Sequence, residues 1–88
     1  MTQRPRARDD VVFRPLDDEW MIFDPTTDRL HALNLTAALI WTSCDGQHDL
    51  AQIAADVADA FGPPAESDAV ADDVQHTVAR FRREGLLA

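Results

Sequence analysis

The chain has 88 residues, which are enough for one compact domain with a modest core and too few for two domains or a deep enzyme cleft. Sixteen acidic residues against eight basic ones give a formal net charge of -8, which disfavours contact with the phosphate backbone of nucleic acids. No apolar run is long enough to cross a bilayer or to form a signal peptide, and the single Cys44 fits a reducing compartment, so we expect a cytoplasmic protein.

The first half of the chain is rich in β-branched and aromatic residues and predicts three strands joined by polar turns. The runs are VVFRPL at 11–16, WMIFD at 20–24 and RLHAL at 29–33. Short turns between consecutive strands favour an antiparallel meander. Pro15 has no amide hydrogen to donate to a ladder, so we expect the first strand to lie at an edge or to carry a bulge.

A short apolar helix follows the third strand almost directly. Asn34 is a candidate N-cap, because its side chain can accept a hydrogen bond from a free amide of the first turn. The helix is predicted from Leu35 to Cys44, with Gly46 at its end. Apolar residues surround this helix on more than one side, so we expect it to form the centre of the core.

Two amphipathic helices complete the chain. Asp49 and Gln52 form a capping-box pattern at the start of the first, and Gly62, Pro63 and Pro64 are predicted to break it. The second is predicted over residues 68–84 after a Ser67 cap, with acidic residues near its start and basic residues near its end, as the helix dipole favours. Its apolar stripe consists of Val70, Val74, Val78 and Phe81.

The order of elements predicts an α+β fold of the winged helix-turn-helix type, a three-stranded antiparallel meander followed by three helices. We expect residues 1–10 to be a flexible N-terminal segment and residues 11–88 to form the domain.

The residues that usually carry chemistry do not form a recognisable site. One Cys and three scattered His match no common zinc spacing, so we expect neither a metal nor another cofactor. Cys44 and His48 could suggest a nucleophile and its base, but no orienting residue or oxyanion-hole motif accompanies them. Trp20 and Trp41 lie in apolar runs where burial is the common outcome. We therefore expect no catalytic residues and no enzymatic activity.

Several segments together resemble the PqqD-like family, the pyrroloquinoline quinone biosynthesis protein D family, whose fold is the RiPP recognition element. The shared features are a strand ending in Leu-Asn, an Ile-Trp helix ending in Asp-Gly, an Asp-Val pair in the last helix and a closing Gly-Leu-Leu. In this chain they are Leu33 and Asn34, Ile40 and Trp41, Asp45 and Gly46, Asp73 and Val74, and residues 85–87. The resemblance runs from about Val11 to the C-terminus.

The resemblance implies a peptide-binding adaptor, a chaperone of natural product biosynthesis. Such a domain binds the leader region of a precursor peptide and presents it to a modifying enzyme, such as a radical SAM enzyme or a leader peptidase. The leader would add as a strand beside the third strand, with its apolar side chains in a groove against the last helix. The residues implied are Arg29, Leu30, His31, Ala32 and Leu33 of the strand and Val70, Asp73, Val74, Thr77 and Phe81 of the helix.

Two matters stay open at the level of sequence. The groove could be lined by the helix flank with Asp73, Thr77, Arg80 and Glu84 or by the flank with Ala71, Gln75 and Arg82. A winged-helix DNA-binding regulator is the alternative function, although acidic residues at the start of the last helix have the wrong sign for DNA. A free strand edge can also pair with its own copy, so a homodimer is a further expectation.

Overall fold

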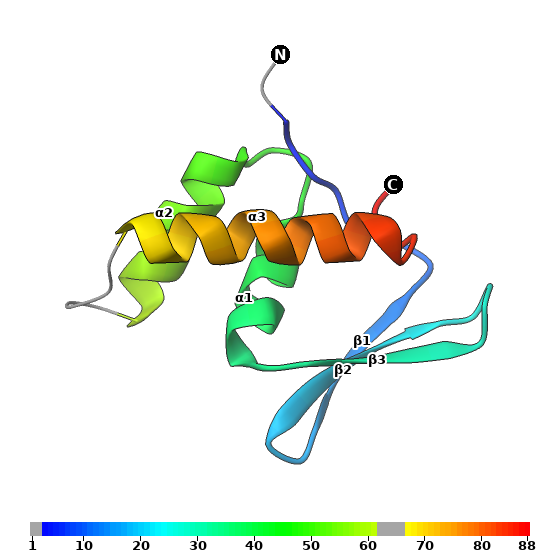
Figure 1. The fold of residues 1–88 in the computed structure, drawn as a ribbon. Helices are drawn as coiled ribbons and strands as arrows, with labels where there is room; N and C mark the ends of the chain where they lie inside the picture. Colours follow the sequence, from blue (N-terminus) through cyan, green and yellow to red (C-terminus); the bar gives the residue numbers. More distant parts are fainter. Residues whose placement is uncertain (1–2, 62–66) are drawn as a thin grey trace.

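A computed structural model gives the fold, and it describes residues 3–61 and 67–88 (Figure 1). Three strands are followed by three helices, as the sequence predicts. The strands are β1 (Val12–Leu16), β2 (Glu19–Asp24) and β3 (Arg29–Leu33), and the helices are α1 (Leu35–Ser43), α2 (Leu50–Phe61) and α3 (Ser67–Arg83). In these two ranges no helix has the length and apolar character that a membrane crossing requires.

The strands form one antiparallel sheet in the order β1-β2-β3, so β1 and β3 are its edges. Pro15 lies in edge strand β1, as predicted. Side chains alternate between two faces, and the register places Phe13, Ile22 and His31 across from one another on the inner face. Val12, Phe23 and Leu30 align on the outer face, where Val12 and Leu30 are exposed.

The predicted caps form as hydrogen bonds. The Oδ1 of Asn34 accepts the amide of Ala37 at 2.9 Å and begins α1. Asp49 and Gln52 exchange two bonds of 2.8 Å at the start of α2, the reciprocal pattern of a capping box. Cys44 is the C-cap of α1, and Gly46 follows with a φ of 80°, a conformation that disfavours residues with a Cβ. The predicted break at Gly62, Pro63 and Pro64 and the predicted capping side chain of Ser67 lie outside the described part.

The core lies where α1 and α3 meet the inner face of the sheet. Trp41 of α1 packs edge-on against Phe81 of α3, with ring centroids 5.2 Å apart, and Phe13 of β1 lies 6.4 Å from Trp41. Trp20, predicted to be in the core, is only partly buried and stacks on Phe13 at 4.9 Å. Leu35 at the start of α1 departs from the predicted burial of that helix, since 57% of it is exposed.

The chain before β1 is hydrogen-bonded to the loop after α1 and to the segment after α3. The amide of Ala7 donates to the carbonyl of Cys44 at 2.8 Å, and the amide of Gly46 donates to the carbonyl of Pro5 at 3.0 Å. On the other side, the amide of Arg8 donates to the carbonyl of Leu86 at 3.0 Å. The predicted domain boundary at residue 11 stays a prediction, and these bonds would have to open for residues 5–8 to move freely.

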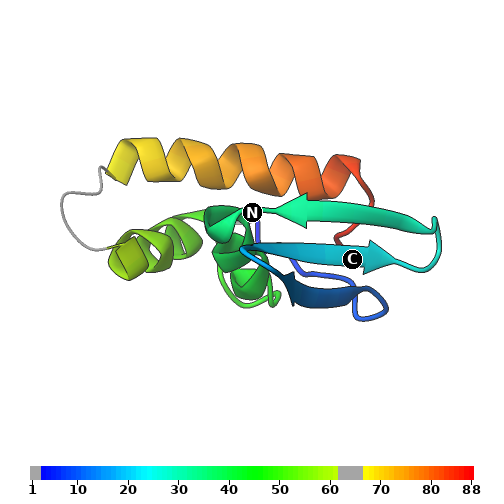
Figure 2. The same cartoon turned by 90° about the horizontal axis from the view of Figure 1, so that it is seen from below.

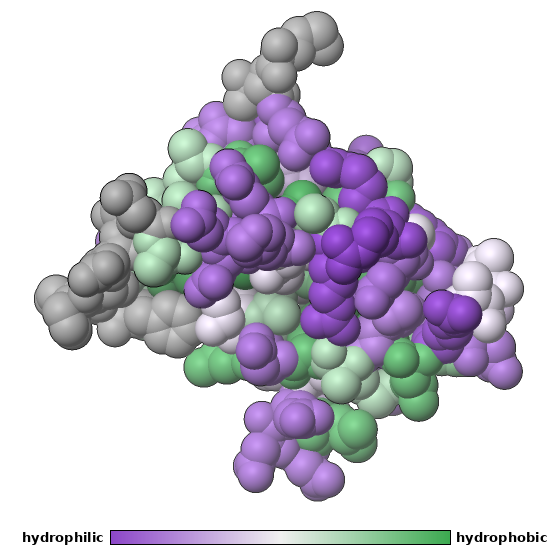
Figure 3. All heavy atoms as spheres, in the orientation of Figure 1, coloured by the Kyte–Doolittle hydropathy of each residue, from purple (hydrophilic) through white to green (hydrophobic). Residues whose placement is uncertain are grey.

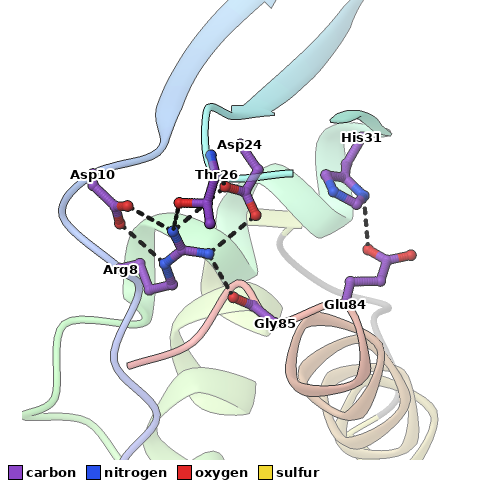
Figure 4. Close-up of polar contacts among 7 residues, drawn as sticks. All are labelled: Arg8, Asp10, Asp24, Thr26, His31, Glu84 and Gly85. Atoms are coloured by element: carbon purple, nitrogen blue, oxygen red, sulfur yellow. Dashed lines mark hydrogen bonds and ion pairs between the residues drawn. The ribbon is translucent and has the colours of Figure 1, made fainter. Parts of the chain in front are cut away.

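Arg8 also fixes this segment through its side chain (Figure 4). Its guanidinium donates to the buried carboxylate of Asp24 at 3.0 Å, to the Gly85 carbonyl at 2.9 Å and to Thr26 Oγ1 at 3.0 Å. Burial opposes ionisation of Asp24, but the Thr26 amide and Arg8 together hold the pKa of this carboxyl below its usual value. Arg8 therefore joins the segment before β1 to the end of β2 and to the turn after α3.

Replacing Arg8 with Met should lower the melting temperature by several degrees at pH 7, because Asp24 would stay buried without its cation. A carboxyl with a depressed pKa contributes stability above its unfolded pKa of about 4 and loses it as the pH falls through the folded value. The difference between wild type and Arg8→Met should therefore shrink toward pH 3. Thermal melts followed by circular dichroism test this, with Arg6→Met as the control, since among the described residues the Arg6 side chain forms an ion pair only with exposed Asp9. An equal effect of both substitutions would contradict the role of Arg8.

Candidate functional site

The outer edge of β3 has no strand beside it in the described ranges, because β3 pairs only with β2. In an antiparallel pair, every second residue directs its amide and carbonyl toward the partner strand, and the residues between them direct these groups away from it. The carbonyl of Ala32 accepts a hydrogen bond from Arg80 of α3, so Ala32 is one of the residues that face away from β2. The same alternation assigns Leu30 to the open edge, and places His31 and Leu33 in the ladder with β2.

Helix α3 runs beside this edge, with β3 lying between α3 and β2 (Figure 2). Two contacts fix which flank of the helix faces the strand. Arg80 Nη2 lies 3.1 Å from the Ala32 carbonyl oxygen. Glu84 Oε2 lies 3.0 Å from His31 Nδ1, a contact that Figure 4 shows. The flank with Thr77, Arg80 and Glu84 is therefore the one beside β3, which the sequence left undecided.

At this junction Arg80 and His31 both contact the carboxylate of Glu84. Glu84 Oε1 lies 3.4 Å from Arg80 Nε, and its second oxygen lies against buried His31. His31 Nε2 is buried and has no hydrogen-bond partner among the described residues. The junction between β3 and the C-terminal half of α3 is thus a compact charged cluster around one exposed strand edge.

The residues that the resemblance implied fall into two groups by exposure. Arg29, Leu30, Ala32 and Asp73 are exposed, and Val70 and Thr77 are half-buried. The side chains of the other four are buried: His31 is 8% exposed, Leu33 1%, and Val74 and Phe81 0%. In this conformation those four contribute to the core or to the polar junction, and a ligand at the surface would meet the first group. Sequence reasoning did not single out Arg80 and Glu84 as site residues, although their i, i+4 spacing on one flank was visible.

Two exposed apolar side chains lie in β3 and at the start of the helix that follows it. Leu30 is 66% exposed and projects from the outer face of β3. Leu35 is also exposed and is the first residue of α1, directly after Asn34. Figure 3 shows hydrophilic residues over most of α3 and apolar residues gathered below it, over the strands. Exposed large apolar residues beside unpaired backbone groups are features of a surface that binds an extended chain.

Cys44 and His48 do not form a nucleophile and base. The Cys44 thiol is buried and donates to the Ile40 carbonyl at 3.2 Å, and burial raises its pKa to about 12. His48 instead contacts Asp45, with 2.9 Å between Nδ1 and Oδ1, and this contact raises the pKa of the imidazole. In residues 3–61 and 67–88 no group of three or more His, Cys, Asp and Glu could hold a metal ion.

The thiol of Cys44 should react slowly in the native protein. Because its pKa is about 12, the thiolate fraction at pH 8 is on the order of one in ten thousand. We expect labelling with a disulfide reagent at pH 8 to be at least about 100-fold slower than in urea, where the pKa returns to about 8.5. Absorbance of the released thiolate measures both rates, and labelling of the folded chain at the denatured rate would contradict the assigned burial.

Comparison with models of known protein families gives a match. The family model described as "Coenzyme PQQ synthesis protein D (PqqD)" matches residues 19–87, well over half of the chain. This chain belongs to the PqqD family. The matched region of this PqqD-family member runs from the start of β2 to residue 87 and includes the β3 edge and α3. A search of curated proteins gave no match.

Two solved structures share the fold of this PqqD-family chain. One, described as "Lasso peptide synthetase B1 complexed with the leader peptide", has a TM-score of 0.80 at 21% identity, over 98% of this chain and 99% of that chain. The other, "TbiB1 in Complex with the TbiA(beta) Leader Peptide", has a TM-score of 0.77 at 18% identity, over 93% of both chains. At these identities the similarity establishes the fold.

Proposed function

We propose that this protein binds the leader region of a ribosomally synthesised precursor peptide by strand addition to β3 and presents it to a modifying enzyme. The observation that carries the proposal is the open β3 edge, with the backbone groups of Leu30 and Ala32 facing away from β2 beside α3. Membership of the PqqD family and the similarity to two proteins solved with leader peptides support it.

The β3 edge suits this role better than the edge at β1. Strand β1 contains Pro15, which cannot donate to an added strand, whereas every residue of β3 has an amide hydrogen. A guest strand on β3 would also lie next to α3, where Thr77 and Val70 are half-buried and Asp73 is exposed. Backbone pairing would give affinity that tolerates sequence variation, and contacts with α3 would give specificity.

The length of the β3 edge is compatible with moderate affinity for a peptide. Residues 29–33 offer a few backbone hydrogen bonds, each worth about 1 kcal/mol net. Two or three guest side chains buried beside Leu30 and α3 would add about 2 kcal/mol each. These contributions together are of the same order as the free energy of a micromolar complex, about 8 kcal/mol.

The proposed function also implies a partner enzyme and a compartment. The modifying enzyme would be one that acts on the core of the precursor, such as a radical SAM enzyme or a leader peptidase, and this chain would supply no catalysis itself. Because the precursor is made by ribosomes, the cytoplasm is the proposed compartment. Without peptide, the free β3 edge could pair with a second copy. The DNA-binding alternative gains no support, since Asp72 and Asp73 are exposed on α3.

A titration followed by amide NMR tests the proposed function. The ligand is a synthetic peptide with the leader sequence of the precursor encoded beside this chain's gene, and a scrambled peptide of the same composition is the control. We expect saturable shifts for residues 29–33 and for 77–84, because these segments border the open edge. Silence of both segments at millimolar peptide would overturn the proposal, as would equal shifts with the scrambled peptide.

A further inference from the structure

The Ala32 carbonyl is the one edge acceptor of β3 with a partner in the described ranges, and that partner comes from α3. Arg80 Nη2 donates to it at 3.1 Å across 48 residues of sequence. A strand added to this edge needs the same carbonyl for one of its own amides. Although a carbonyl oxygen can accept more than one hydrogen bond, a guest strand at Ala32 would compete with Arg80 for this acceptor and for space beside it.

Arg80 is held loosely enough to be displaced. Its side chain is 35% exposed, and its other partner is Glu84 Oε1 at 3.4 Å, a long bond. Glu84 is shared with His31, whose Nδ1 lies 3.0 Å from the second carboxylate oxygen. When a guest takes the carbonyl, Glu84 alone does not satisfy the guanidinium, which has five donors in a fixed planar arrangement.

We propose that Arg80 determines specificity at the β3 edge: it caps the Ala32 carbonyl in the free protein, and a guest strand that displaces it is selected for an acidic side chain that binds the released guanidinium. This inference rests on the proposed function and adds the chemistry of the preferred leader. Arg80 reaches the edge from α3, so the acidic residue would project from the guest toward the helix. A carboxylate matches the guanidinium with two parallel hydrogen bonds and restores a charged partner where solvent access is limited.

The proposal differs from what net charge alone suggests. A protein with a formal charge of -8 would favour basic peptides everywhere on its surface. At the β3 edge the cation Arg80 contacts the strand, and displacement removes its carbonyl acceptor, which a guest carboxylate can replace. The guest preferred at this position is thus opposite in sign to the one that the whole molecule attracts.

Selection from a random peptide library tests the inference and does not depend on the sequence of the natural leader. Phage-displayed 12-residue peptides are selected on wild type, on Arg80→Met and on the matched control Arg82→Met. Arg82 lies on the same helix and is exposed, and its side chain makes no hydrogen bond or ion pair within the described ranges. We expect peptides from wild type and Arg82→Met to share an Asp or Glu at a fixed distance from their apolar residues, and peptides from Arg80→Met to lack it.

The affinity of one selected peptide then gives the size of the effect. Replacing its acidic residue with the matching amide should weaken binding to wild type by about 10-fold, the loss of one charge-assisted hydrogen bond. The same replacement should leave binding to Arg80→Met within about 2-fold, because the partner is absent. Arg80→Lys, which keeps the charge, should recover part of the preference and guards against a purely structural effect.

Each outcome has a defined meaning. Peptides that bind the β3 edge without acidic preference, or with the same preference in Arg80→Met, would overturn this inference and leave the proposed function intact. Failure to select any peptide that shifts the amides of residues 29–33 would overturn both. Melting curves of the three variants confirm that each is folded under the conditions of selection.

Discussion

Ala32→Pro should weaken leader binding by between about 10- and 100-fold while the domain stays folded. The amide of Ala32 faces away from β2, so its loss leaves the β2–β3 ladder intact and removes one donor from the open edge. The proline ring would also occupy the space that a paired guest strand needs. One lost hydrogen bond and the disturbed neighbouring bond together correspond to a change of about 1.4 to 2.7 kcal/mol.

Ala32→Val is the matched control. Valine keeps the amide hydrogen, favours strands and places its larger side chain on the outer face, where Ala32 is exposed. Isothermal calorimetry with the leader peptide measures affinity for both variants, and far-UV circular dichroism verifies that both are folded. Unchanged affinity in folded Ala32→Pro would mean that the peptide binds away from the β3 edge.

Phe81→Ala should destabilise the protein by about 3 to 5 kcal/mol, which is a large share of the 5 to 15 kcal/mol typical of small domains. Phe81 is fully buried and packs edge-on against Trp41 at 5.2 Å. Its removal would leave a cavity between α1 and α3 that the surrounding side chains cannot fill completely. Urea unfolding followed by tryptophan fluorescence measures the change.

This substitution also distinguishes two roles for Phe81, which the family resemblance implied as a peptide-binding residue. His76→Ala is the control, because His76 is exposed on the same helix and should change stability by no more than about 0.5 kcal/mol. If Phe81→Ala retained the wild-type free energy of unfolding but lost affinity for the leader, Phe81 would be a contact residue that becomes exposed on binding. The buried position in the free protein predicts the opposite.

Local signals were sufficient to predict the elements and their order. The Asn34 cap, the capping box of Asp49 and Gln52 and the bounds of β3 depend on interactions within a few residues, and each is present where the sequence predicted it. Pro15 predicted that the first strand lies at an edge or carries a bulge, because proline has no amide hydrogen, and β1 is an edge of the sheet. The family resemblance, which requires only an ordered set of such features, is confirmed by the match over residues 19–87.

Other features could not be obtained in this way. Leu35 has the apolar character of a core residue, yet it is exposed because the helix direction is set by packing elsewhere along α1. Leu33, Val74 and Phe81 belonged to the implied binding set, and the packed structure shows that their side chains are buried, as the apolar stripe indicated for Val74 and Phe81. Arg8 lies within the predicted flexible segment 1–10, and its contact with Asp24 joins positions 16 residues apart.

The sequence by itself determined that the chain forms a three-stranded meander and three helices, with a strand that leads directly into a capped helix. Hydrophobic periodicity and capping act over one or two turns, so they can be read from neighbouring residues. Only the tertiary structure decided that the flank of α3 with Arg80 and Glu84 faces β3, and hence which side chains border the open edge. The rotation of a helix about its axis depends on how its whole apolar stripe packs against distant elements, and no local pattern specifies it.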